Sequence, residues 1–163
     1  MKKQIILLTN LFLFLGSLAL NAQDAQQECN IKYNLFKGDY QSKKYEDAYP
    51  NWMYLMDNCQ KLSINVYKLG DKLAQVRFKN AENKTEAAAL VKRVYLQRLE
   101  NFPAKDPAKA HSNYATFLIK NKLASDEEVF EILQLAYSLD PTRMSVKNIY
   151  RYFQGITDTY KDT

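Results

Sequence analysis

Apolar residues recur every three or four positions along most of the chain, and this spacing is typical of amphipathic helices. It predicts seven helices, whose apolar positions fall within residues 31–36, 45–56, 64–76, 87–99, 114–118, 129–139 and 149–153. No stretch shows the sustained alternation of a strand, and Gly and Pro number only four each. Because turn-rich β-folds use both residues freely, the pattern predicts an all-α fold.

Breaks in this pattern place the first turn. We expect the first helix to end at Gly38 and Asp39 and the second to start near Ser42. Pro50 falls inside the second helix and cannot donate a backbone hydrogen bond, so we expect a local kink there.

Capping signals place the later helices. Two helix starts are expected where a capping residue precedes an acidic residue by three positions, at Asn83–Glu86 and Ser125–Glu128. A third is expected at Asp106–Pro107, where a capping residue stands directly before a proline. The pair Asp140–Pro141 ends the sixth helix, and the seventh should begin near Thr142.

The first residues carry the three parts of a secretory signal peptide. Met1-Lys2-Lys3 is positively charged, residues 5–20 are almost wholly apolar, and Ala22 offers a small residue for cleavage. Since crossing a bilayer takes about 20 apolar residues, we expect residues 1–22 to be removed, with a retained anchor or a lipoprotein as alternatives. The domain of residues 23–163 would then be periplasmic or secreted, with no stable membrane span.

The charge of the chain does not indicate a nucleic-acid partner. The formal net charge of +5 falls to +3 without Lys2 and Lys3, and no later run of basic residues exceeds two. Because nucleic-acid-binding domains concentrate their positive charge, we expect a mixed, solvated surface and no nucleic acid.

One apolar spacing occurs twice, before Gln60 and before Pro141: Ala48-x3-Trp52-x2-Leu55-x4-Gln60 and Val129-x3-Leu133-x2-Ala136-x4-Pro141. A second spacing, of the kind found in the first helix of a pair, follows Gln60: Val66-x2-Leu69-Gly70-x2-Leu73. Over about residues 29–163 the chain resembles the tetratricopeptide repeat proteins, in an exported bacterial form. It departs from their pattern at Gln60, where a proline is usual, and by about eight extra residues around residues 80–83.

This resemblance implies an α-solenoid of antiparallel helix pairs, a right-handed superhelix of about three and a half repeats. An unrelated helical bundle is the alternative. The seventh helix has no eighth to pair with, so it either caps the array or the chain is the front part of a longer protein.

The resemblance also implies a non-enzymatic scaffold of the cell envelope that binds a protein or peptide partner in a concave groove. Tyr33, Tyr67 and Tyr114 would occupy the same position in successive first helices, with Lys37 one turn after Tyr33. Rings with a polar tip are effective contact residues. The alternative is that these tyrosines pack between repeats. The lysine and asparagine pattern that clamps a partner's C-terminal carboxylate is not recognisable.

No arrangement of residues predicts catalysis, a metal or a cofactor. The one histidine, His111, lacks metal-ligand spacing, and we expect it at the surface or as a helix cap. The pair Glu127–Glu128 is explained by the first turn of a helix, where the helix dipole favours acidic residues. An envelope protein that binds cell wall or lipid is the competing function.

Cys29 and Cys59 are the only cysteines, and export would place them where disulfides persist. Cys29 lies at the start of the first helix, and Cys59 lies just past the end of the second. An antiparallel pair brings these points to the same end, opposite the Gly38 turn. We therefore expect a disulfide, with two buried free thiols as the alternative.

Overall fold

The computed structural model describes the backbone of residues 24–161 and the side chains of residues 24–157. The predicted signal peptide, residues 1–22, lies outside the described residues. Within the described range the chain forms helices and turns and no β-strand, which confirms the all-α prediction. No helix in this range is both long enough and apolar enough to cross a membrane. The described chain divides into two compact units, one that ends at Leu62 and one that begins at Ser63.

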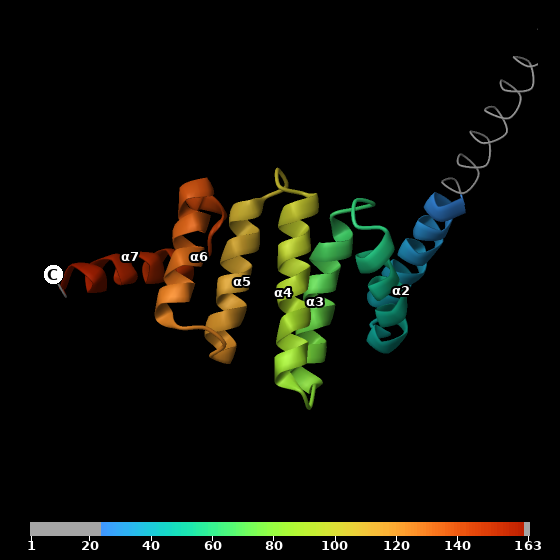
Figure 1. Cartoon of the computed structure of the whole chain (residues 1–163), viewed down its shortest axis with the longest axis horizontal. Coiled ribbons are helices and arrows are strands. Elements are labelled where there is room, and N and C mark those ends of the chain that lie inside the picture. The colour runs from blue at the N-terminus through green and yellow to red at the C-terminus, as the bar shows by residue number, and fades with distance from the viewer. Residues whose placement is uncertain (1–23, 162–163) are drawn as a thin grey trace, which may run out of the picture. The chain divides into compact units, whose positions relative to one another are not determined.

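The first unit is a helical hairpin. Residues 24–41 are helical, and α2 (Tyr45–Asn58) runs back along them (Figure 1). The large side chains from both helices are fully buried: Phe36, Trp52, Leu55 and Met56. Burying a side chain of this size contributes about 1.5–3 kcal/mol, so these residues account for much of the stability of the hairpin.

The turn of the hairpin comes later than the sequence predicted. The first helix continues through Gly38 to residue 41, and Lys43 takes a left-handed φ of 60°. The backbone N–H of Lys44 donates to the Asp39 carbonyl at 2.9 Å, and that of Lys43 donates to the Tyr40 carbonyl at 3.0 Å. This pair of bonds closes a helix C-terminus, a role in which glycine usually takes the left-handed position.

The predicted break at Gly38 and the predicted start near Ser42 are therefore wrong. A glycine inside a helix costs about 1 kcal/mol, and burial of the neighbouring Phe36 offsets that cost. Because residues 42–44 form the turn, α2 begins at Tyr45 and carries Pro50 within it.

The second unit holds the remaining helices of the described chain. They are α3 (Asn65–Asn80), α4 (Lys84–Asn101), α5 (Pro107–Asn121), α6 (Asp126–Leu139), the short 3-10 helix η1 (Pro141–Arg143) and α7 (Val146–Lys161). The closest packing joins α3 to α4 and α5 to α6, and α4 also meets α5 while α6 meets α7 (Figure 1). The apolar core between them includes Val66, Leu73, Phe78, Val91, Val94, Phe117, Val129 and Leu133.

The capping residues predicted for α4 and α6 are confirmed. Asn83 Oδ1 accepts from the backbone N–H of Glu86 at 3.2 Å. Ser125 and Glu128 form a full capping box, because each side chain accepts from the other residue's backbone N–H, at 3.2 Å and 2.8 Å. Such caps satisfy N–H groups that the first turn of a helix leaves unpaired.

The starts of α5 and α7 differ from the prediction in detail. Asp106 stands at the N-cap of α5, but its side chain makes no cap. Its carboxylate instead accepts from Arg143 Nε at 3.0 Å and also from the terminal nitrogen of that guanidinium. The start of the seventh helix near Thr142 is wrong, because Asp140 accepts from the Thr142 N–H at 2.9 Å and nucleates η1, so that α7 begins at Val146.

Two residues of α7 fix how it packs. Asn148 is fully buried, and its Nδ2 donates to the Ser112 carbonyl at 2.8 Å and to the Ser112 and Thr116 hydroxyls at 2.9 Å. At Gly155 an added methyl group would overlap the ring of Phe130 on α6. Hydrogen bonds to α5 and close approach to α6 therefore hold α7 in place.

Candidate functional site

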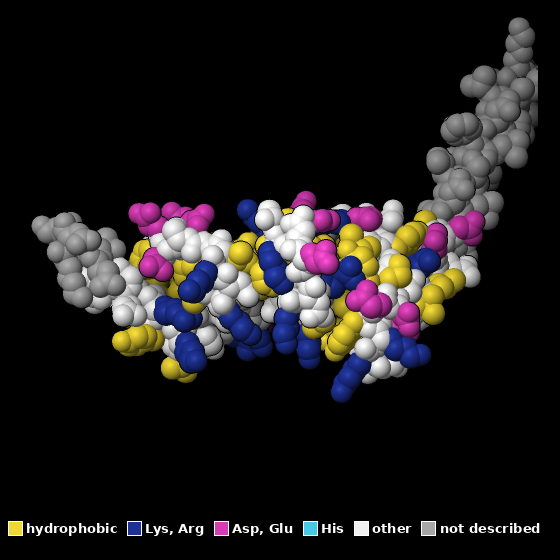
Figure 2. Space-filling model, turned by 90° about the horizontal axis from the view of Figure 1, so that it is seen from below, with side chains coloured by type: hydrophobic (Ala, Val, Ile, Leu, Met, Phe, Trp, Pro, Cys, Tyr) yellow, Lys and Arg dark blue, Asp and Glu magenta, His cyan; other side chains and the backbone are white. Residues whose placement is uncertain are grey.

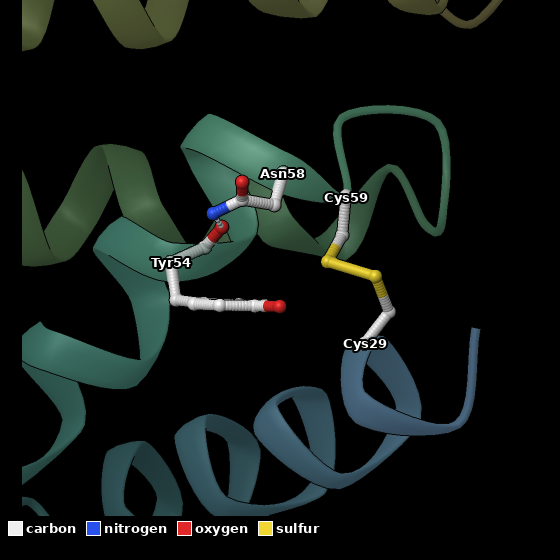
Figure 3. Close-up of a disulfide and its surroundings, with 4 residues drawn as sticks. All are labelled: Cys29, Tyr54, Asn58 and Cys59. Carbon is white, nitrogen blue, oxygen red and sulfur yellow. Dashed lines mark hydrogen bonds between the residues drawn. A yellow bond between two sulfur atoms is a disulfide. The ribbon is translucent and has the colours of Figure 1, made fainter. Parts of the chain in front are cut away.

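The predicted disulfide is present. Cys29 and Cys59 are bonded, with their Cα atoms 5.8 Å apart and 30 positions apart in sequence. Figure 3 shows the bond joining the helix of residues 24–41 to the residue that follows α2, with the Tyr54 ring extending into the space between the two helices. Lys32 Nζ lies 5.4 Å from the centre of that ring, a cation–π distance. The bond and this contact close the hairpin at the end opposite its turn.

The four predicted groove residues fall into both units. Tyr33, which is partly buried, and Lys37, which is exposed, lie on the helix of residues 24–41 in the first unit. Tyr67 on α3 and Tyr114 on α5 lie in the second unit, where they line one hollow. The structure thus brings two of the four together.

The hollow lies between α3, α4 and α5 and has a volume of about 20 Å³. Its lining comprises Tyr67, Asp71, Val94, Tyr95, Arg98, Ala110, Asn113 and Tyr114. A space of this size admits one water-sized group. It is therefore a seat for a single polar group and not a pocket for a side chain or a small molecule.

Aromatic rings form one wall of the hollow. The rings of Tyr95 and Tyr114 stack with centroids 4.1 Å apart and planes 12° apart. Burial raises the pKa of Tyr95 to about 12, and the neighbouring Tyr114 adds to the effect. Both hydroxyls therefore stay protonated at neutral pH, and that of Tyr95 is already paired with His111 Nδ1 at 2.6 Å.

Tyr67 differs from the prediction of an open contact residue. Its side chain is fully buried, its ring meets Phe102 edge-on with centroids 5.9 Å apart, and its hydroxyl accepts from Asn101 Nδ2 at 3.3 Å. Burial raises its pKa to about 12. Tyr67 and Tyr114 both line the hollow. They differ in exposure, because Tyr67 is fully buried in the core and Tyr114 is half-buried.

Two oppositely charged residues, Arg98 and Asp71, line the hollow. Arg98 is 8% exposed, and one terminal nitrogen of its guanidinium donates weakly to the carbonyls of Lys105 and Asp106, at 3.4 Å and 3.3 Å. Among the described residues its Nε–H has no hydrogen-bond partner. Asp71 accepts from Gln75 Nε2 at 3.0 Å, and burial raises the pKa of its carboxyl while this bond and Arg98 act in the opposite direction.

This arrangement offers recognition chemistry, because it combines a guanidinium, a carboxylate and phenol hydroxyls in the lining of one hollow. A group that both accepts and donates hydrogen bonds matches this mixture of donors and acceptors.

The one histidine, His111, lies in the core of the second unit. His111 is 6% exposed and its Nδ1 lies 2.6 Å from the Tyr95 hydroxyl, so the expectation of a surface or capping histidine is wrong. The turn of α5 that carries it faces α4, and burial lowers its pKa. Among the described residues no group of three or more His, Cys, Asp or Glu could hold a metal ion.

Four residues of the hollow were not predicted from the sequence: Asp71, Tyr95, Arg98 and Asn113. A signal was present for two of them. Asp71 follows Tyr67 by four residues and so shares its helix face. Arg98 continues the buried spacing of Val91 and Val94, and a charged residue in an apolar register marks a special site.

Comparison with protein-family models, with curated proteins and with solved structures finds no match to this chain.

Proposed function

We propose that this protein is a non-enzymatic scaffold of the cell envelope that binds a segment of another protein, and that the hollow between α3, α4 and α5 seats one peptide group of that segment. The observation that carries the proposal is that the buried Arg98 and the carboxylate-bearing Asp71 line one hollow together with Tyr67, Tyr95 and Tyr114.

A peptide group suits this pair of side chains. Its carbonyl accepts a hydrogen bond and its N–H donates one, so a single group can satisfy both Arg98 and Asp71. The net charge of the pair is zero, which favours a neutral polar ligand over an ion at this point. The volume of about 20 Å³ limits the ligand to one such group.

In the free protein a water molecule can fill the same role. Replacing it with a peptide group retains the hydrogen bonds and releases the water, whose immobilisation costs up to about 2 kcal/mol. The stacked rings of Tyr95 and Tyr114 supply a rigid wall, so binding orders few side chains. The hollow would therefore fix the register of a bound segment, while surrounding contacts supply affinity.

The repeated spacing before Gln60 and Pro141 supports a tetratricopeptide-like arrangement, in which helix pairs stack into a right-handed superhelix. The disulfide supports an oxidising compartment, since cytosolic proteins rarely keep one. Together they support a periplasmic or secreted scaffold.

The test is a rim substitution that closes the hollow without touching the core. Asn113 is exposed and lines the hollow, so Asn113→Trp should cover it. Lys92 is exposed on α4 and lies outside the lining, so Lys92→Trp is the matched control. Protein from the exporting host is used to capture partners from envelope extract.

The proposal expects a discrete protein that Lys92→Trp retains and Asn113→Trp loses, with both variants melting within a few degrees of the parent. Equal capture by the two variants would show that the hollow is not the site. Sedimentation with cell wall or liposomes, without any protein captured, would favour the competing envelope function.

A further inference from the structure

As far as residue 157, where the described side chains end, the solvent-facing stripes of α3, α5 and α7 carry positive charge only. On α3 the exposed cations are Lys68, Lys72 and Lys79, on α5 they are Lys109 and Lys120, and on α7 they are Lys147 and Arg151. Within each of two sets the residues are separated by three, four, seven or eleven positions, so each set follows one side of its helix: 68, 72 and 79 on α3, and 109, 113, 116 and 120 on α5. We call these three stripes the basic face. No exposed Asp or Glu lies on the described part of these helices.

Acidic residues gather elsewhere in the same unit. The first turns of α6 hold Asp126, Glu127, Glu128 and Glu131, and α6 contains no Lys or Arg. Figure 2 shows dark blue Lys and Arg side chains along the lower edge of the region from α3 to α7, while magenta Asp and Glu side chains predominate along the upper edge. The modest net charge of the chain therefore hides a separation of charge within this unit.

This separation works against helix stability. Lys68 and Lys72 are four residues apart, as are Lys147 and Arg151. Like charges at this spacing destabilise a helix, whereas a Glu at either position would stabilise it. The pattern is thus not explained by the stability of α3 or α7.

The hollow opens on the basic face. Asn113 belongs to the α5 stripe and also lines the hollow, and Asp71 of the hollow directly precedes Lys72 of the α3 stripe. A chain segment seated in the hollow would therefore pass between lysines on α3 and lysines on α5. From this position we infer that the segment is acidic, with Asp or Glu side chains beside the seated peptide group; this inference rests on the proposed function.

A lipid surface fits the same face less well. Membrane-surface helices combine basic residues with exposed apolar or aromatic ones that enter the acyl region. The α3 and α5 stripes pair their lysines with Gln75, Asn113 and Thr116 and include no apolar residue. Exposed aromatic and aliphatic side chains on the described part of these three helices belong to α7 alone, at Val146, Tyr150 and Phe153.

The experiment selects binders for the exported protein from random peptides of about 12 residues displayed on phage, a length that spans several helices. Enriched peptides should be acidic. The affinity of a selected peptide should fall about tenfold in the double variant Lys68→Glu/Lys109→Glu and less than about twofold in Lys92→Glu/Lys105→Glu, which has the same net charge. It should also fall between about 0.05 M and about 0.5 M salt, because ions screen exposed charges.

Neutral or basic enriched peptides, or equal losses in the two double variants, would overturn the inference and leave the scaffold proposal standing. Enrichment of no peptide would overturn both. Binding to phosphatidylglycerol vesicles that Lys68→Glu/Lys109→Glu abolishes, with no peptide enriched, would assign the basic face to lipid instead.

Discussion

Removal of the Cys29–Cys59 disulfide should destabilise the first unit and leave the second unit unchanged. The bond spans 30 positions and lies wholly within the unit that ends at Leu62. In the chain-entropy model, a closed loop of this length removes about 12 cal/mol/K from the unfolded chain, or about 3.6 kcal/mol at 25 °C. A two-helix hairpin has a small core, so we expect this contribution to be a large share of its stability.

The chain carries its own probe for this measurement. Trp52 is the only tryptophan, it lies on α2, and it is fully buried. Its fluorescence should report unfolding of the first unit, while far-ultraviolet circular dichroism reports the helices of both. In urea with a reductant, the fluorescence midpoint should move to lower concentration, and the part of the dichroism change that belongs to the second unit should not move.

The variant Cys29→Ser/Cys59→Ser is the control, since its midpoint should match that of the reduced protein and should not respond to the reductant. A shift in the Trp52 midpoint equivalent to less than about 1 kcal/mol would refute the reasoning, because the unfolded chain would then gain little freedom from reduction. Two free thiols in denatured, unreduced protein would refute the bond itself.

Three further perturbations test the second unit and the helix glycines. His111 is the only histidine and burial lowers its pKa, so as pH falls from about 7.5 to about 5.5 the unfolded chain takes up a proton before the folded chain does. Urea titrations should therefore show stability falling over this range, and His111→Gln should remove that slope. Asn148→Ala should lower the free energy of unfolding in urea by about 1–3 kcal/mol, because the amide that hydrogen-bonds α7 to α5 is lost. The control is Asn113→Ala at an exposed position, and a similar loss there would contradict this role of Asn148. Gly38→Ala should raise the urea midpoint of the first unit by the equivalent of about 0.5–1 kcal/mol, since a methyl group there meets nothing within 4 Å. Gly155→Ala should not stabilise the second unit, because the Phe130 ring would have to move. Equal gains in the two variants would show that this ring moves at no cost.

Helix starts could be predicted where one side chain controls the local backbone. Asn83 and Ser125 cap their helices as their spacing indicated, because a cap depends on residues three positions apart. The end of the first helix could not be predicted in this way. Gly38 is typical of a helix end, yet the helix continues past it because the buried Phe36 holds that turn of the helix in the core of the hairpin. Tertiary packing outweighed a local propensity of about 1 kcal/mol.

The candidate site shows the same division. Tyr67 and Tyr114 were singled out by their equivalent positions in two helices, and they do line one hollow. The sequence could not show that Phe102 covers the Tyr67 ring or that Tyr95 stacks on Tyr114, because these partners come from separate segments. His111 was misplaced for the same reason, since its burial depends on how α5 is rotated against α4.

Arg98 bears most directly on the choice between a structural and a binding role for the hollow. Replacing buried charged groups by well-packed apolar side chains is often neutral or stabilising, so stability alone does not require an arginine at this position. One structural role is visible, because a terminal nitrogen of Arg98 contacts the carbonyls of Lys105 and Asp106 in the α4–α5 loop. Those contacts are long, and Arg98 also lines the hollow together with Asp71. We therefore expect Arg98 to have two roles: it anchors the loop through its terminal nitrogen, and it lines the hollow in which we propose that a partner segment binds.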